Sequence, residues 1–321
     1  MSSDSDAPAC FHAGIERTAR VWLSRLPPDA DPRTLPPRTI DHALRALAVC
    51  LQHGQNPDLT MDLALALHTT MIRIGQWRVW EHYLRTLVAA GHPGGQLERW
   101  LRVRHRLGEI WFRMGRMDEA ILLAHESRAL ALNSGNLTMQ YAATSILAEA
   151  SLNKGDHSLA LRYAEETVTL AAAMSNKALE ADGWINSARA LLGADNYAEA
   201  NQRLWHAHAL ALTADDAVYQ AKARLFLGHG AMHRAHWPEA LAHFDAAQAL
   251  VSSYGDEVGR ATVQTHLGSV LTELGQWDAA ARLLEDAVRV LRRHGNEPAE
   301  HNALRRLSEL EARRATASPL M

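Results

Sequence analysis

The sequence predicts an all-α solenoid in which antiparallel helix pairs stack side by side, and three observations support this prediction. Five segments align with one another without a gap, each 40 residues after the last. Every segment carries small residues at two fixed positions and, in most, a recognisable turn signal between them. Alanine and leucine are abundant while aromatic residues make up only 6% of the chain, which favours closely packed helices.

The composition indicates a folded chain and excludes several classes of protein. Hydrophobic residues make up 47% of the 321 residues, too many for a disordered chain. The net charge is −3 without a clustered basic face, so we expect no nucleic-acid partner. Cys10 and Cys50 are too few for a disulfide framework or a four-ligand zinc site. The sequence shows neither a signal peptide nor a long apolar run, so we expect a cytoplasmic protein without a membrane segment.

The two small-residue columns predict where the helices of each pair cross. The aligned segments run over residues 107–120, 147–160, 187–200, 227–240 and 267–280. The first column holds glycine or alanine, at Gly108, Ala148, Ala188, Gly228 and Gly268. The second holds alanine throughout, at Ala120, Ala160, Ala200, Ala240 and Ala280. Because small side chains let two helices approach closely, we expect both columns to be buried at helix crossings.

The residues between the two columns predict a tight turn followed by a bulky wedge. Glycine or Asp-Asn reaches positive φ cheaply, and these residues stand at Gly115, Gly155, Asp195-Asn196 and Gly275. The wedge position holds Met117, Tyr197, Trp237 or Trp277. For the remaining repeat tryptophans we also expect a place in the core or between repeats. These are Trp77, Trp80, Trp100, Trp111, Trp184 and Trp205.

The repeat frame also predicts the organisation of the whole chain. Upstream, Gly75 and Trp77 match the turn, but Trp80 replaces the small alanine and His68 replaces the small glycine. The repeat frame therefore extends upstream in weaker form, and we expect a polar capping helix at the other end. The predicted segments are a disordered N-terminus (1–8), irregular helices with a degenerate repeat (9–60), repeats (61–297), a capping helix (298–314) and a tail (315–321).

The Leu-Gly, Tyr/Trp and Ala positions resemble the tetratricopeptide repeat (TPR), with a period of 40 instead of the usual ~34 residues. Repeats of this length resemble those of kinesin light chains, of the sensor domain of maltose-regulator-type activators and of peptide-sensing Rap-type regulators. The resemblance covers residues 61–295 well and 9–60 loosely. It implies a right-handed superhelical α-solenoid with the first helix of each pair on the concave face. No Walker A segment or basic helix-turn-helix signature is evident, so we expect repeats without an ATPase or DNA-binding module.

The resemblance also implies a set of partner-binding residues, because TPR proteins contact ligands through exposed positions of their first helices. These positions hold Arg102, His105, Arg106, Glu109, Asn153, Asp182, Asn186, Arg189, Lys222, His229, His233 and His266, with Glu149, Ser269 and Glu273 beside them. We expect these side chains to be exposed inside the superhelix. Asn186 and Lys222 match part of the clamp that holds a C-terminal carboxylate, but the full set is missing.

The sequence predicts neither a metal site nor a catalytic one. His229, His233 and His236 have a spacing that could ligate zinc, yet no glutamate follows the first histidine and His236 belongs to a turn. With 18 histidines in the chain, we interpret this spacing as coincidental. No G-x-S-x-G, G-x-G-x-x-G or C-x-x-C motif is evident, so we expect no enzyme activity and no cofactor.

The prediction is therefore a non-catalytic scaffold or adaptor that binds a protein or peptide in its concave groove. Two alternatives stay open: a regulatory sensor that responds to a ligand or peptide, and an accessory subunit of a larger effector complex. The sequence leaves the partner and the oligomeric state undetermined.

Overall fold

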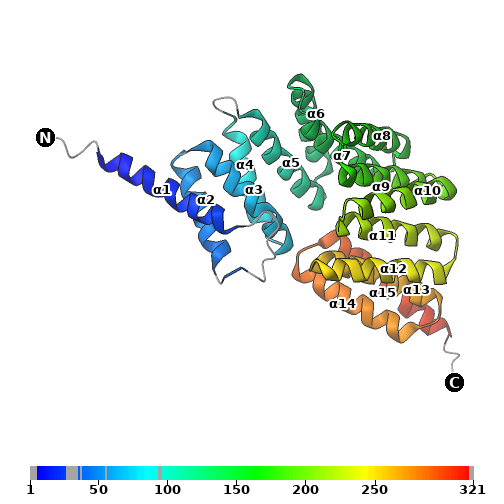
Figure 1. Cartoon of the computed structure of the whole chain (residues 1–321). Coiled ribbons are helices and arrows are strands. Elements are labelled where there is room, and N and C mark those ends of the chain that lie inside the picture. The colour runs from blue at the N-terminus through cyan, green and yellow to red at the C-terminus, as the bar shows by residue number, and fades with distance from the viewer. Residues whose placement is uncertain (1–5, 27–34, 37, 55, 93–95, 318–321) are drawn as a thin grey trace. The chain divides into compact units, whose positions relative to one another are not determined.

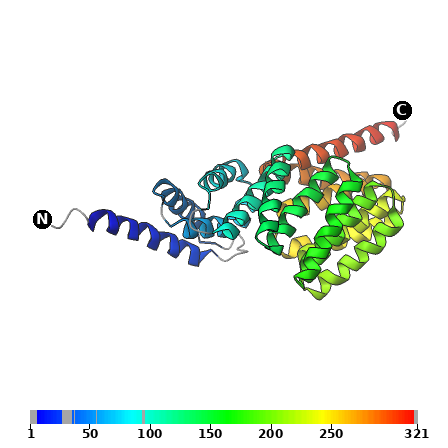
Figure 2. The same ribbon diagram turned by 90° about the horizontal axis from the view of Figure 1, so that it is seen from above.

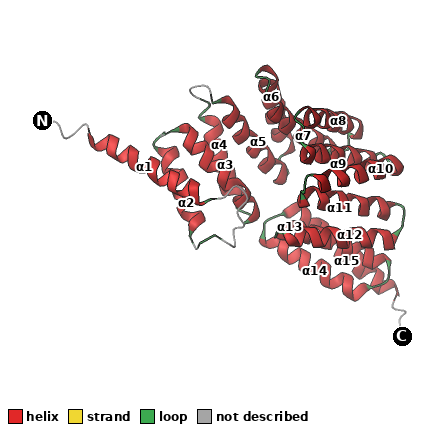
Figure 3. Cartoon of the chain, viewed as in Figure 1, coloured by secondary structure: helices red, strands yellow, loops and turns green. Residues whose placement is uncertain are grey.

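The computed structural model describes residues 6–26, 35–36, 38–54, 56–92 and 96–317, and this part of the chain contains fifteen α-helices and no strand (Figures 1 and 3). The helices are α1 (Asp6–Arg25), α2 (Thr39–Gln52), α3 (Pro57–Arg73), α4 (Trp77–Ala89), α5 (Leu97–Arg113), α6 (Met117–Asn133), α7 (Leu137–Asn153), α8 (His157–Ala173), α9 (Lys177–Gly193), α10 (Tyr197–Thr213), α11 (Ala217–His233), α12 (Trp237–Ser253), α13 (Glu257–Glu273), α14 (Trp277–Arg293) and α15 (Glu297–Ala317). The prediction of an all-α repeat fold is confirmed.

The chain divides into two compact units, residues 1–139 and 140–321, with the boundary in the first turn of α7. This boundary falls inside the range 61–297 that we predict as one repeat array. Helix α1 begins at Asp6, before the predicted residue 9, and α15 continues to Ala317 instead of ending at residue 314. The remainder of the predicted disordered ends, residues 1–5 and 318–321, lies outside the described residues.

The repeat is more regular than its sequence, because every helix from α5 to α14 has 17 residues and starts 20 residues after the one before. A three-residue turn separates each pair of helices. Its middle residue has positive φ, as at Gly115, and the two amides after the helix bond back to its last turn: Gly115 N–H to Phe112 O (3.1 Å) and Arg116 N–H to Trp111 O (2.8 Å). Alanine adopts the same conformation at Ala235 (φ 55°).

The third residue of each turn is the N-cap of the following helix. In α8, α9, α11 and α13 this residue is Asp156, Asn176, Asp216 or Asp256, whose side chain accepts a hydrogen bond from a backbone N–H in the first turn. One short turn therefore ends one helix and begins the next. This double use of the turn explains why the repeat tolerates no change of length.

The small-residue columns lie at the helix crossings, as the sequence predicts. The five alanines of the second column are fully buried. In the first column, a Cβ atom at Gly228 would lie 2.6 Å from the Phe244 ring, and one at Gly268 would lie 2.6 Å from Leu284 Cγ. These distances are shorter than van der Waals contact, so a larger residue would force the two helices of the pair apart.

The upstream repeat of α3 and α4, which matches the frame more weakly, closes its crossing in a different way. Trp80 and His68 occupy the two small-residue positions, and both are buried. The indole Nε1–H of Trp80 donates a hydrogen bond to His68 Nδ1 at 3.0 Å. Two large rings thus replace two small residues, and the hydrogen bond satisfies the polar atoms that this exchange buries.

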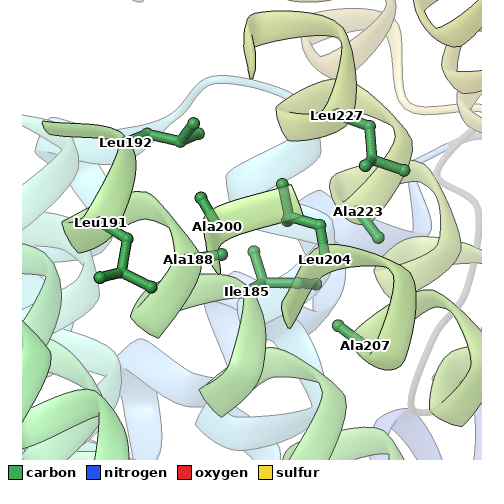
Figure 4. Packing of buried hydrophobic residues seen from close by; sticks show 9 residues of the cluster. All are labelled: Ile185, Ala188, Leu191, Leu192, Ala200, Leu204, Ala207, Ala223 and Leu227. Carbon is green, nitrogen blue, oxygen red and sulfur yellow. The ribbon is translucent and has the colours of Figure 1, made fainter. Parts of the chain in front are cut away.

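The core of unit 2 consists of small clusters, each shared by adjacent helices. The cluster in Figure 4 brings together three helices through Ile185 and Ala188 of α9, Leu204 of α10, and Ala223 and Leu227 of α11. Because each helix pair buries its apolar face only against its neighbours, stability accumulates from local interfaces.

The first helices of unit 2 form the more closely spaced row. Helix α9 contacts α11 and α13 contacts α15, whereas α10, α12 and α14 reach the next repeat through its first helix. Figure 1 labels the helices of this unit, and Figure 2 shows the same ribbon from above. In a curved stack the more closely spaced row lies on the inside, so this spacing favours the first helices as the inner row.

We expect Ala200→Leu to lower the free energy of unfolding by about 1–3 kcal/mol, because Ala200 is fully buried and the larger side chain overpacks the crossing of α9 and α10. Ala198→Leu is the matched control, since Ala198 is exposed on the same helix. Denaturant unfolding measures both variants. An unchanged midpoint for Ala200→Leu would show that this column is not a helix contact.

Candidate functional site

The predicted partner-binding residues all lie on first helices, but the structure gives them different environments. Arg102, Asn153 and His233 are exposed. The prediction of exposure is wrong for Asp182 and Asn186, which are buried, because neighbouring side chains of the same face cover and bind them. The set is divided between the two units: Arg102, His105, Arg106 and Glu109 belong to unit 1 and the others to unit 2.

In unit 2, polar side chains of three successive first helices bind one another, and we call this set the inner polar column (Tyr141 and Glu149 of α7, Asp182, Asn186 and Arg189 of α9, and Lys222 of α11). Asp182 lies at its centre, where Oδ2 accepts a hydrogen bond from the Tyr141 hydroxyl at 3.0 Å. The other oxygen, Oδ1, binds Lys222 Nζ at 3.1 Å. A weaker ion pair joins Arg189 to Glu149 at 3.4 Å. Residues about 40 positions apart in the chain thus become neighbours in the column.

Asn186 is the member of the column whose buried side-chain atoms include one without a hydrogen-bond partner among the described residues. Its Oδ1 accepts a hydrogen bond from Arg189 Nη1 at 2.9 Å, which fixes the orientation of the carboxamide. The amide nitrogen Nδ2 is buried and has no hydrogen-bond acceptor among the described residues. An unpaired buried donor costs about 1–3 kcal/mol, so such a group is retained where something else pairs with it.

Burial and charge act against each other within the column. Burial alone would lower the pKa of Lys222, but the carboxylates of Asp182 and Glu149 outweigh it and raise this pKa. Burial, together with the charge of Asp182, raises the pKa of the Tyr141 hydroxyl well above its ordinary value. Lys222 therefore stays charged and Tyr141 stays a hydrogen-bond donor. The Lys222 side chain is 42% exposed, so this charge is within reach of a ligand.

The structure pairs the predicted histidines across repeats and not along one helix. His229 Nε2 of α11 lies 3.2 Å from His266 Nε2 of α13, whereas His233 stacks on Tyr197. Phe226 and Phe244 enclose the pair with their rings. Because α11 turns His229 and His233 toward different partners, the zinc spacing noticed in the sequence does not form a chelate. The described residues contain no group of three potential metal ligands.

The His229–His266 pair is held in the neutral state. Burial and the charge of Arg306 lower the pKa of His266 to about 4. Burial also lowers the pKa of His229 well below its ordinary value, with further contributions from His266, His233, Arg189 and Arg306. The contact between α11 and α13 is therefore built for uncharged imidazoles.

In unit 1, Glu109 collects most of the predicted residues around one carboxylate. It accepts hydrogen bonds from Arg106 Nη1 at 2.8 Å and from His68 Nε2 at 3.1 Å, and His105 Nε2 lies 3.9 Å away. Burial alone would raise the pKa of Glu109, but His105, His68 and Arg106 outweigh it and hold this pKa well below its ordinary range. This cluster pairs its own charges, so it serves α3–α5 packing better than it serves a ligand.

Sequence reasoning missed three residues of these clusters. His68 and Tyr141 take part directly, and Phe226 lies 5.0 Å below the Arg189 guanidinium. The sequence does carry a signal for these three residues, because each stands 37 to 41 residues from its partner, close to the repeat period of 40. The expectation of a core position is wrong for Trp205, which is 43% exposed.

The repeats are tetratricopeptide-like. Residues 219–293 match the family model described as tetratricopeptide repeat, which covers part of α11 and all of α12–α14. No curated protein matches the sequence significantly. The structures similar to this chain have the same all-α repeat fold.

Three solved structures illustrate the likeness. A Rap protein in complex with competence and sporulation factor matches 98% of this chain and 89% of its own length, with a TM-score of 0.63 and 12% identity. NprR in complex with its cognate peptide NprX matches 96% of this chain and 85% of its own, with a TM-score of 0.60 and 13% identity. A STAND protein of Pyrococcus horikoshii with a tetratricopeptide repeat sensor matches 85% of this chain and 43% of its own length, with a TM-score of 0.55 and 14% identity. At these identities the likeness establishes the fold alone.

Within the described part of the chain, no helix combines the length and the apolar character needed to span a bilayer.

We expect acid to destabilise unit 2 through His266, because its pKa of about 4 lies below the ordinary value near 6.5. Below pH 6.5 the unfolded chain takes up a proton that the folded chain refuses, so the free energy of unfolding falls between pH 6.5 and 4. The loss from this one group reaches at most about 3 kcal/mol. Thermal unfolding across this range should show a shallower pH slope for His266→Gln than for the unaltered protein. His301→Gln, an exposed histidine of α15, should leave the slope unchanged, and equal slopes for all three proteins would contradict the expectation.

Proposed function

We propose that this chain is a non-catalytic adaptor that binds a protein or peptide segment along the first helices of unit 2. The observation that carries the proposal is the buried Nδ2 donor of Asn186, held in one orientation by Arg189 within a column of polar side chains. A bound segment would supply a backbone carbonyl as the missing acceptor by displacing the side chains that cover Nδ2 in the free protein. An asparagine that donates to a peptide backbone recognises an extended segment whatever its side chains are.

The charges around Asn186 favour a segment with acidic character. Arg189 and Lys222 flank the carboxamide, and both are only partly covered. Their partners Glu149 and Asp182 offset these charges in the free protein, so a ligand carboxylate has to compete with them. Such competition gives selectivity and a dependence on salt, because exposed ion pairs weaken as ionic strength rises.

Two of the similar structures support peptide binding as the use of this fold. The Rap protein and NprR are both described in complex with a peptide or factor, and both match this chain over more than nine-tenths of its length. Extended inner surfaces of repeat proteins are their usual binding surfaces.

A second candidate, a sensor that responds to a peptide or small ligand, is favoured by the position of the ion pairs. Asp182–Lys222 joins α9 to α11, and Glu149–Arg189 joins α7 to α9. A ligand that takes Lys222 or Arg189 from its partner therefore removes a link between successive repeats and changes their stacking. In an accessory subunit of a larger complex, the same surface would be covered permanently by its partner.

The test begins with a partner identified by purification of the tagged protein and mass spectrometry of co-eluting proteins. Titration calorimetry then compares Asn186→Ala and Arg189→Glu with the unaltered chain. We expect Asn186→Ala to weaken binding about tenfold, the effect of losing one buried hydrogen bond, and Arg189→Glu to weaken it further. The effect of Arg189→Glu should shrink at high salt.

Arg282→Glu is the control, because Arg282 is exposed on a second helix, α14. It makes the same charge change away from the inner polar column. If the control loses affinity while the two column variants keep it, the partner binds elsewhere and the proposal is wrong.

A further inference from the structure

At the fourth position of three aligned repeats, counted from Leu101, a polar or aromatic side chain pairs with the second helix of the same repeat; at the equivalent Thr144 the buried hydroxyl has no hydrogen-bond partner among the described residues. Arg104 shows the pattern most fully: its guanidinium is buried, binds Glu126 Oε2 at 2.5 Å and donates from Nε to Ser127 Oγ at 3.0 Å. The ring of Trp100 lies 4.6 Å from Arg104 Cζ. The buried guanidinium of Arg104 thus contacts a carboxylate, a hydroxyl and the face of an aromatic ring.

Other repeats keep a pairing at the same two positions. Gln264 donates to Asp286 Oδ2 at 3.4 Å, and the Trp184 ring meets the His206 ring edge-on at 5.3 Å. In each case the partner stands 22 residues after the first-helix residue, as Glu126 stands after Arg104. The spacing is therefore a property of the repeat.

Arg224 occupies this position in α11, but its repeat lacks the partner. Ala246 and Ala247 stand where Glu126 and Ser127 stand relative to Arg104. Among the described residues, no carboxylate pairs with Arg224. Its guanidinium lies over the Trp205 ring at 4.9 Å and its Nη1 lies 3.5 Å from His243 Nδ1. A guanidinium in this setting lacks the anion that such a group normally binds.

Arg224 lies in a surface that we call the Trp205 face: Trp205 and Leu212 of α10 are its exposed residues, Arg224 of α11 is partly covered, and His208 of α10 and His243 of α12 are buried beneath it. Trp205 is 43% and Leu212 is 56% exposed, and both project from one side of α10. His208 is 7% exposed between them, and its Nδ1 has no partner. The Trp205 ring meets His208 and His243 edge-on at 5.8 Å.

The electrostatics of the Trp205 face favour a negative ligand. Burial, then the charge of Arg224, lowers the pKa of both His208 and His243, so neither adds a charge near neutral pH. Glu239 lies 3.9 Å from His243 Nε2, and its two oxygens already bind Arg234 and His236. Arg224 therefore carries a positive charge without a paired carboxylate among the described residues, beside the exposed Trp205 ring.

We propose that the Trp205 face binds an acidic segment of a partner protein, whose carboxylate pairs with Arg224 while an adjacent apolar side chain packs on Trp205 and Leu212. The carboxylate takes the place that Glu126 fills for Arg104. Tryptophan and arginine together are the residues most enriched among those that dominate binding energy at protein interfaces. This surface shares no residue with the inner polar column, so it can be tested without changing that column.

The probe for this site is an acetylated, amidated peptide of alternating glutamate and leucine residues. The matched peptide has glutamine in place of glutamate. NMR titration of the full chain follows the Trp205 indole N–H and the Arg224 Nε–H. We expect saturable shifts of both signals with the glutamate peptide, and a dissociation constant at least about fivefold higher with the glutamine peptide.

Three variants locate the effect. Arg224→Gln removes the charge, and Ala246→Glu supplies in the same chain the carboxylate that Glu126 supplies to Arg104. Both should raise the dissociation constant at least about fivefold, as loss of a charge-assisted pair does, and Ala246→Glu should do so without loss of thermal stability. Arg282→Gln removes an exposed charge from α14 and should leave binding unchanged.

The proposal is overturned if the glutamate peptide causes no saturable shift at millimolar concentration. Equal affinity for the glutamine peptide overturns it as well, because binding would then not depend on the carboxylate of the ligand. Unchanged affinity of the Ala246→Glu variant for the glutamate peptide also overturns it, because Arg224 would then be paired within the chain and could not be the group that binds the peptide. A response to inorganic phosphate alone that matches the glutamate peptide would make this a general anion site and overturn the assignment to a protein segment. Failure of the inner-column variants in the adaptor test has no bearing on these outcomes, because none of them changes a residue of that column.

Discussion

The close crossing of the two helices in each pair is the contact on which the rest of the structure depends. A Cβ atom at Gly228 or Gly268 would collide with the side chain across the crossing, and the alanines of the second helices are fully buried. Because each crossing is fixed at the same residue, every regular helix has the same length and every turn has three residues. Equivalent positions of successive first helices then lie side by side, which brings Asp182 to Lys222 across a 40-residue separation.

A fixed register also makes departures from the repeat informative. Arg104 and Glu126 satisfy each other at equivalent positions of one repeat. Where only one of the two positions holds a polar residue, that group has no such partner, as for Arg224 opposite Ala246. The repeat of α3 and α4 shows the opposite case, since both of its positions hold large residues, Trp80 and His68, that bond to each other. When both residues of a pair differ from the repeat, packing is preserved. When only one differs, a polar group remains available to a ligand.

The sequence could predict the helices, turns and crossings because their causes are local or strictly periodic. Glycine marks most of the positive-φ residues, and small residues recur at the crossing. It could not predict that Asn186 is buried, since this depends on how Arg189 folds over it. Nor could it predict that His229 binds His266, because the i,i+4 pair with His233 is equally plausible on a helix and only the angle of α11 to α13 decides. Periodicity determines which helices meet, and side-chain conformations determine which atoms do.

Helix α11 links the two proposed binding surfaces. Lys222 reaches Asp182 of α9, while Arg224, two residues later, reaches Trp205 of α10 and His243 of α12. Two residues correspond to about 200° of helical rotation, so the two cations leave α11 on opposite sides. Both cations belong to one helix of 17 residues that packs closely at Gly228. Under the sensor alternative, a ligand that separates Lys222 from Asp182 displaces the same helix that positions Arg224, and occupation of one surface then alters affinity at the other by an equal factor in both directions.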